Sequence, residues 1–235
     1  MFELTEEQIA IRDMTRDFVR TDVTPFALEW DAAAAVSKEA VAKAGSLGLF
    51  GVTMPPEWGG AGADFLAYVL ATEELAYGDA GLCNMINASN SYGMKIRDFG
   101  ADRQKERYLR PVAVGDALGC MLLTEPQAGS DAGNLRTRAV RTANSYLING
   151  SKALITSAQA ARFACVIAVT DPDAGKKGIS AFLVPTDRPG YQVLRHERKL
   201  GHRSNQTCQV ELENLEVPEE DMLGAPGEGL KIALS

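Results

Sequence analysis

The feature that most constrains the fold is a change in the apolar pattern near Gly119. Before this point apolar residues recur at helical spacing, as Ile11, Met14 and Phe18 do on one helical face. After it, apolar runs of strand length appear, such as Phe163–Val169, separated by Asn, Asp, Gly and Pro. The pattern predicts an α+β chain with several domains, in which a helical domain precedes a β-barrel or β-sandwich.

Several helix boundaries in the first half carry recognisable capping signals. Thr5 and Gln8 fit a capping box at the start of the first helix. Ser37 and Asp64 are each placed to cap a later helix. A longer helix is expected over residues 81–97. The first ~112 residues are therefore expected to be helical.

The second half shows strand and turn signals. The pair Asn149-Gly150 lies between apolar stretches, which predicts a two-residue hairpin turn. Ile179–Val184 is a second continuous apolar run, and Cys208–Leu212 alternates apolar with polar residues as a half-buried strand does. Leu230–Leu234 resembles the opening turn of a further helix. A chain that stops there is expected to lack a third, helical part.

Composition excludes some classes of function. The net charge of −7 and the pI of about 5.0 argue against nucleic-acid binding, which depends on clustered Lys and Arg. No apolar run is long enough to cross a membrane, and the acidic start Met1–Glu7 lacks the features of a signal peptide. A cytoplasmic location is expected. Four widely spaced cysteines predict buried free thiols and no metal site: Cys83, Cys120, Cys165 and Cys208.

The segment Leu122–Asp131 carries the strongest chemical signal. It reads as a strand end followed by a loop of small residues. Gly129 would let the backbone approach a ligand closely, and the amides of Gly129 and Ser130 could bind an anion together. Thr124 adds a hydroxyl at the strand end. An ordinary solvated turn would explain such a loop if it stood alone.

Five segments in register resemble one protein family, the acyl-CoA dehydrogenases. Thr124–Asp131 is similar to the family signature T-E-P-x-A-G-S-D. Ile148–Ser157 is similar to I-N-G-x-K-x-W-I-T-N, and Leu200–Thr207 to M-G-x-R-x-S-x-T. Glu73–Gly78 and Pro56–Gly60 match family positions in the helical domain. The resemblance covers essentially the whole chain.

The resemblance implies a division into three parts. Residues 1–115 would form the N-terminal helical domain, and residues 116–224 a flavin-binding β-barrel middle domain. Residues 225–235 would begin a C-terminal helical bundle, before which the chain is truncated. The catalytic Glu of the family lies in that bundle, beyond Ser235. No catalytic residue is therefore assigned here, and this chain alone is expected to be inactive.

The family implies FAD as the cofactor and an acyl-CoA thioester as the substrate. Leu123 and Thr124 would bond the polar edge of the flavin ring, and Thr156 would place its hydroxyl near flavin N5. Leu154 departs from the pattern, because most relatives have Trp there. The implied cofactor-binding residues are Met121, Leu123, Thr124, Gly129, Ser130, Leu154, Ile155 and Thr156. The implied substrate-binding residues are Ser130, Asn87 and Asn90.

The implied reaction is α,β-dehydrogenation of acyl-CoA to trans-2-enoyl-CoA, with fatty acid metabolism as its setting. Electron-transferring flavoprotein would accept the electrons, and the full-length protein would be a homo-oligomer, either a dimer or a homotetramer. Two alternatives remain open. One is an acyl-CoA oxidase or another flavoprotein on the same fold. The other is a catalytically inactive two-domain binding module.

Overall fold

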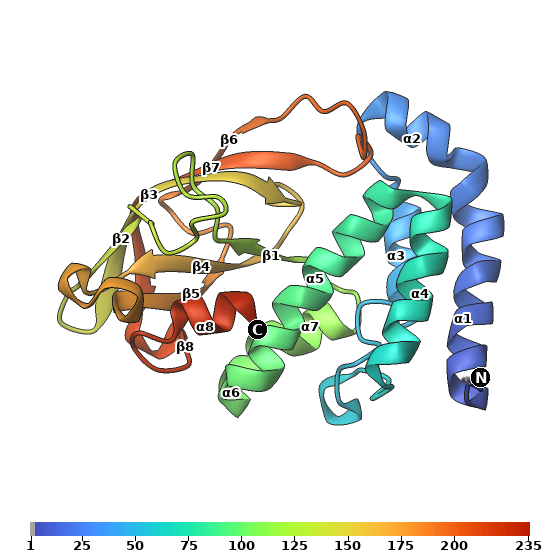
Figure 1. Ribbon diagram of the computed structural model, residues 1–235, viewed down its shortest axis with the longest axis horizontal. Coiled ribbons are helices and arrows are strands. Elements are labelled where there is room, and N and C mark those ends of the chain that lie inside the picture. The colour runs from blue at the N-terminus through green and yellow to red at the C-terminus, as the bar shows by residue number, and fades with distance from the viewer. Residues whose placement is uncertain (1–2) are drawn as a thin grey trace.

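A computed structural model describes residues 3–235 and places helices in the first half and strands in the second (Figure 1). The helices are α1 (Glu6–Phe18), α2 (Ala27–Ala33), α3 (Lys38–Ser46), α4 (Phe65–Gly78), α5 (Ala80–Phe99), α6 (Asp102–Gln104), α7 (Arg110–Ala113) and α8 (Gly229–Leu234). The strands are β1 (Gly119–Leu122), β2 (Arg138–Arg141), β3 (Ser145–Thr156), β4 (Phe163–Val169), β5 (Ile179–Pro185), β6 (Tyr191–His196), β7 (Thr207–Pro218) and β8 (Met222–Leu223). Across the described residues, no helix combines the length and apolar character that a bilayer span requires.

The helices begin where the sequence predicts. The Thr5 hydroxyl accepts the Gln8 amide at 3.2 Å, and the Gln8 side chain accepts the Thr5 amide at 3.0 Å, which completes the capping box of α1. Ser37 caps α3, and Asp64 caps α4. These caps satisfy amides that would otherwise lack an acceptor in the first helical turn.

The strands form one eight-stranded sheet, so the predicted order of a helical part followed by a β part is confirmed. Its hydrogen-bonded order is β6-β7-β3-β2-β4-β5-β8, and β1 pairs with β4 in parallel. The long pair β3 and β7 runs antiparallel, with Thr156 opposite Thr207 at one end. Because β1 follows α7 directly, it carries the chain from the helical part into the sheet beside α5 (Figure 1).

Strand β4 is buried on both faces, which explains its continuous apolar run. Phe163, Cys165 and Ile167 pack in a core shared with Tyr92 and other residues of the helical part. The alternate residues of β4 pack in a second core inside the β part: Ala164, Val166 and Ala168. The four cysteines are free and buried, as the sequence predicts.

The prediction of a hairpin turn at Asn149-Gly150 is wrong. Both residues lie inside β3, and the hairpin that joins β2 to β3 turns at residues 142–145 instead. The pair marks a β-bulge, where the register with β7 shifts between Ile148 and Gly150. Gly150 has a φ of +153°, and the Asn149 side chain accepts the Asn214 amide at 2.8 Å. Gly150 therefore forms part of a bulge. The neighbouring residues alone cannot distinguish a bulge from a turn.

Candidate functional site

A buried ion pair lies beneath the segment that the sequence singles out. The Lys152 side chain is 0% exposed and Glu125 is 3% exposed. The Lys152 Nζ lies 2.9 Å from Glu125 Oε1 and donates to the Leu123 carbonyl at 3.0 Å. Lys152 comes from the middle of β3 and Glu125 from the loop after β1. The pair therefore locks the end of β1 onto β3.

Glu125 accepts hydrogen bonds at both carboxylate oxygens. Oε2 accepts the Arg136 amide at 2.7 Å and the Gln127 side chain at 2.7 Å, and Oε1 accepts the Thr137 amide at 3.1 Å. Burial alone would raise the pKa of Glu125, but the Lys152 ammonium and these donors outweigh burial and hold that pKa well below its ordinary value. Burial lowers the pKa of Lys152, against the opposing effect of Glu125. Glu125 is thus a structural anion.

This lowered pKa leads to a prediction about acid stability. Because the folded pKa of Glu125 lies below the unfolded one, its stabilisation is present above about pH 4.3 and is lost as pH falls further. We expect the difference in unfolding free energy between wild type and Glu125→Gln to narrow as pH falls from 7 toward 3. Urea unfolding followed by circular dichroism measures both. A difference that stays constant with pH would show that Glu125 has the same pKa in the folded and the unfolded chain.

Three predicted cofactor residues lie close together where β1 and β3 end: Thr124, Leu154 and Thr156. The Ala153 amide donates to the Thr124 carbonyl at 2.9 Å, which sets Thr124 beside the bulge that precedes Ile155. Leu154 occupies this bulge with a φ of +58° and a side chain that is 62% exposed. Thr156 follows and is half-buried. Three of the predicted cofactor-binding residues are therefore neighbours in the structure.

Two other predicted cofactor residues face the interior. The Ile155 side chain is 2% exposed and packs in the core of the β part. Met121 is half-buried and packs against the core shared with the helices. The Ile155 side chain is therefore unavailable to a ligand. Leu123 is half-buried, and its carbonyl is occupied by Lys152.

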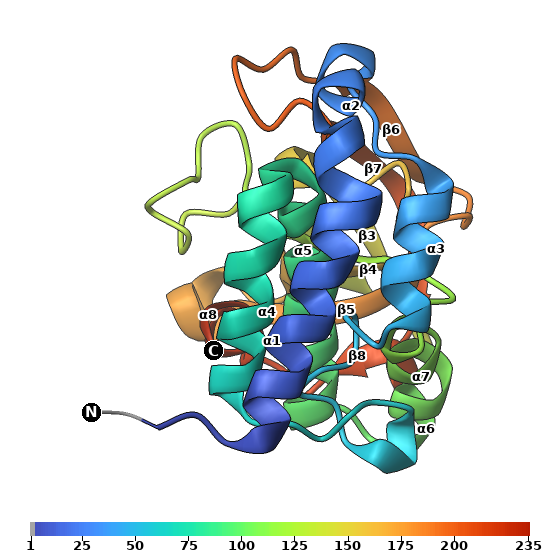
Figure 2. The ribbon, with the colours of Figure 1, turned by 90° about the vertical axis from the view of Figure 1, so that its right-hand side faces the viewer.

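The loop after Glu125 carries Gly129 and Ser130 on the surface. Glu125 and Ala128 exchange two backbone hydrogen bonds of 3.1 Å, which tightens the base of the loop. Gly129 and Ser130 are exposed, and within residues 3–235 their amides donate to no acceptor. A Cβ added at Gly129 would meet nothing within 4 Å. Figure 2 shows the yellow-green loop standing out from the body of the molecule. Its free amides could hold an anion.

The two predicted substrate-binding asparagines differ in surroundings. Asn87 on α5 is half-buried, and its oxygen accepts the Tyr68 hydroxyl at 3.0 Å. Asn90 is 0% exposed, and its amide nitrogen donates to the carbonyls of Leu49 and Ile86. Asn90 therefore tethers α5 to the segment that follows α3, and of the two only Asn87 keeps exposed surface.

Sequence reasoning missed the role of Lys152. Its signal was present, because a lysine flanked by Ala153, Leu154 and Ile155 in a strand must either project outward or find a buried anion. The partner, Glu125, lies 27 residues earlier in the chain. Only the pairing of β3 with the end of β1 brings the two together.

Comparison with known proteins identifies the family. Residues 5–116 match the family description "Acyl-CoA dehydrogenase, N-terminal domain", and residues 120–215 match "Acyl-CoA dehydrogenase, middle domain". An acyl-CoA dehydrogenase of Bacillus subtilis is 41% identical over 233 residues, which are 99% of this chain and 62% of the relative. The chain belongs to the acyl-CoA dehydrogenase family, of which it contains the N-terminal and middle domains.

Solved structures agree with this assignment. Butyryl-CoA dehydrogenase from Megasphaera elsdenii matches with a TM-score of 0.95 and 37% identity, over 99% of this chain and 62% of that one. A glutaryl-CoA dehydrogenase from Mycobacterium smegmatis, in complex with FADH2, matches with a TM-score of 0.91 and 35% identity, over 98% of this chain and 58% of that one. The chain thus spans about three fifths of the length of these relatives.

Proposed function

We propose that this chain supplies the flavin-binding face, and part of the substrate wall, of an FAD-dependent acyl-CoA dehydrogenase. The observation that carries the proposal is the set of free donors and exposed apolar surface at the adjoining ends of β1 and β3. Thr124, Leu154 and Thr156 lie there. The exposed loop that carries Gly129 and Ser130 follows Thr124 in the chain. Membership of the family supports the same cofactor, since a related structure contains FADH2.

The residues at this edge fit the chemistry of FAD. Within residues 3–235, neither the Thr124 nor the Thr156 hydroxyl has a hydrogen-bond partner, so both can serve the polar edge of a flavin ring. Leu154 offers an apolar surface, and the free amides of Gly129 and Ser130 suit a pyrophosphate. FAD, when bound, would supply the acceptor for a hydride.

The proposed reaction converts an acyl-CoA into trans-2-enoyl-CoA and removes two hydrogens. The α-hydrogen leaves as a proton to a base, and the β-hydrogen leaves with its electron pair. Glu125 is not that base, because its oxygens are engaged by Lys152 and three further donors. The family pattern assigns the base to a position after Ser235. This chain's contribution is to orient the reactants and to exclude water.

The proposal extends to partners and domains. Residues 1–115, 116–224 and 225–235 would be the helical domain, the middle domain and the start of a third. Ser130 and Asn87 would contact acyl-CoA, electron-transferring flavoprotein would accept the electrons, and the complete protein would form dimers or tetramers. A cytoplasmic location fits four buried cysteines that stay unpaired.

The proposal is tested by the difference between FAD and riboflavin. On titration with FAD, we expect amide resonances of Gly129, Ser130, Leu154 and Thr156 to shift in two-dimensional NMR spectra. Riboflavin lacks the pyrophosphate, so it should shift Leu154 and Thr156 and leave the loop unchanged. Absence of shifts at all four residues, at FAD concentrations that saturate the related holoenzymes, would overturn the proposed site.

We also predict that Leu154→Gly changes stability and cofactor binding in opposite directions. A left-handed backbone costs Leu about 1–2 kcal/mol, whereas Gly costs about 0.5–1 kcal/mol in unfolded-state entropy. Because the side chain is 62% exposed, little burial is lost and the free chain should become slightly more stable. FAD affinity should fall, because the apolar contact disappears. Urea unfolding and FAD titration provide the two measurements.

Val140→Gly is the matched control. Val140 is also 62% exposed, but it lies on β2 with ordinary strand geometry. This variant should be destabilised by about 1 kcal/mol, because Gly weakens a strand, and should bind FAD unchanged. If Leu154→Gly were destabilised as well, the left-handed conformation of Leu154 would not be strained.

A further inference from the structure

The connection between β6 and β7 concentrates positive charge on an acidic protein. Residues 195–203 contain four Arg and Lys residues and one Glu, whereas the whole chain carries a net charge of −7. Both histidines of the chain, His196 and His202, also lie in this segment. Glu197 is already paired with Arg195, at 3.1 Å. The other three cations therefore have no acidic partner within this segment.

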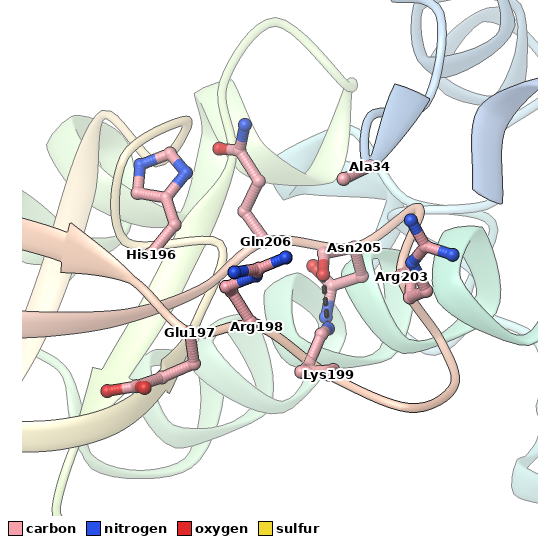
Figure 3. A pocket seen from close by; sticks show the side chains of 8 residues that line it. All are labelled: Ala34, His196, Glu197, Arg198, Lys199, Arg203, Asn205 and Gln206. Atoms are coloured by element: carbon pink, nitrogen blue, oxygen red, sulfur yellow. Dashed lines mark hydrogen bonds between the residues drawn. The ribbon is translucent and has the colours of Figure 1, made fainter. Parts of the chain in front are cut away.

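These cations line a pocket of about 430 Å³. Figure 3 shows the side chains of His196, Arg198 and Gln206 around its mouth, with the Glu197 carboxylate directed away from them. Lys199 stabilises the loop itself, because its Nζ donates to the His202 carbonyl at 2.7 Å and to the Asn205 carbonyl. The pocket thus has a fixed floor and a cationic rim.

Two donors of the pocket have no partner within residues 3–235. Arg198 is exposed and makes no ion pair or hydrogen bond there. Asn205 is 0% exposed, and its amide nitrogen lacks any acceptor, although its oxygen accepts the Ser157 hydroxyl at 3.1 Å. A buried donor without an acceptor is unfavourable, because it has given up its hydrogen bonds to water without replacing them. Arg203 is only loosely paired, at 3.5 Å from Asp31. Unused donors beside cations suit an anion that accepts several hydrogen bonds.

We propose that this pocket binds a phosphate group. A guanidinium such as that of Arg198 matches phosphate oxygens in a bidentate manner, and Asn205 and Gln206 can add neutral donors. A cavity of about 610 Å³ adjoins the pocket, shares Gln206 with it, and is lined by Val36, Met85 and Leu118 among others. That apolar space suits the remainder of a phosphate ester such as a nucleotide. The site is separate from the Gly129–Ser130 loop and does not depend on FAD binding.

The test compares three probes on the isotope-labelled chain: inorganic phosphate, ADP and adenosine. Phosphate and ADP should produce saturable amide shifts at residues 196–206, and adenosine should not. Tighter binding of ADP than of phosphate would identify a nucleotide as the source of the phosphate, and equal binding would identify the free ion. Shifts with adenosine as large as those with ADP, or no saturable shift with either anion, would overturn the proposal.

Arg198→Gln should weaken ADP binding about tenfold or more, because it removes a charge-assisted bidentate contact. Arg198 is exposed and unpaired, so the substitution should leave the fold intact. The matched control is Arg138→Gln on β2, which removes one exposed charge outside the pocket. Its affinity should stay within about twofold of wild type, as expected for a screened distant charge. Equal weakening by both variants would reveal general electrostatic attraction and no pocket.

Discussion

Replacing Lys152 by Met should destabilise the protein by about 3–5 kcal/mol, because it leaves the buried Glu125 carboxylate without its counterion. Met has similar length and fills irregular space, so packing loss is a minor part of the effect. The Leu123 carbonyl would lose its donor as well. For a chain of this size, such a loss lowers the melting temperature by roughly 6–20 °C. Chemical unfolding followed by circular dichroism measures the change.

Two further variants separate the ion pair from other effects. Glu125→Gln combined with Lys152→Met removes both charges but keeps an acceptor for only one of the Arg136 and Thr137 amides, so it should recover part of the lost stability. Lys38→Met, at an exposed lysine of α3, should change stability by no more than about 0.5 kcal/mol. A double variant less stable than Lys152→Met alone would contradict the ion-pair explanation.

The ion pair also explains how far the sequence could predict the site. The caps at Thr5, Ser37 and Asp64 and the buried strand Phe163–Val169 follow from residues close in sequence, and all were predicted. The candidate site depends on contacts between residues that are far apart in the sequence. Whether Lys152 points inward is decided by where Glu125 lies across the sheet, and periodicity within β3 does not contain that information.

The bulges of β3 show the same limit more locally. Gly150 permits a turn and a bulge equally well, and the partner strand β7 decides between them. At Leu154 a second bulge places a large apolar residue in a left-handed conformation that its side chain disfavours. Residue preference would assign Leu to ordinary strand geometry. This unfavourable backbone conformation occurs at the proposed cofactor site, and strained residues are often found at functional sites.

In the full-length enzyme, replacing Thr156 by Val should slow reduction of the bound flavin by an acyl-CoA about 10- to 150-fold. The prediction rests on the proposed function, in which the Thr156 hydroxyl donates a hydrogen bond to the flavin where the hydride arrives. Losing a bond of about 1.5–3 kcal/mol that forms in the transition state gives a factor of this size. The substitution keeps the shape of a half-buried side chain at the end of β3, so the fold should persist. Anaerobic stopped-flow absorbance on the flavin-loaded enzyme measures the rate.

Thr186→Val is the matched control for the loss of a threonine hydroxyl. Thr186 is also half-buried, but its hydroxyl donates to the Ala161 carbonyl at 2.7 Å, at the end of β5. That variant should lose about 1 kcal/mol of stability and keep its rate of flavin reduction. Thr156→Val should show the reverse, because its hydroxyl has no partner within residues 3–235 whose loss would destabilise the fold. An unchanged reduction rate in Thr156→Val would place the hydride-accepting atom away from the end of β3. A loss of stability without a change in rate would make Thr156 a packing residue.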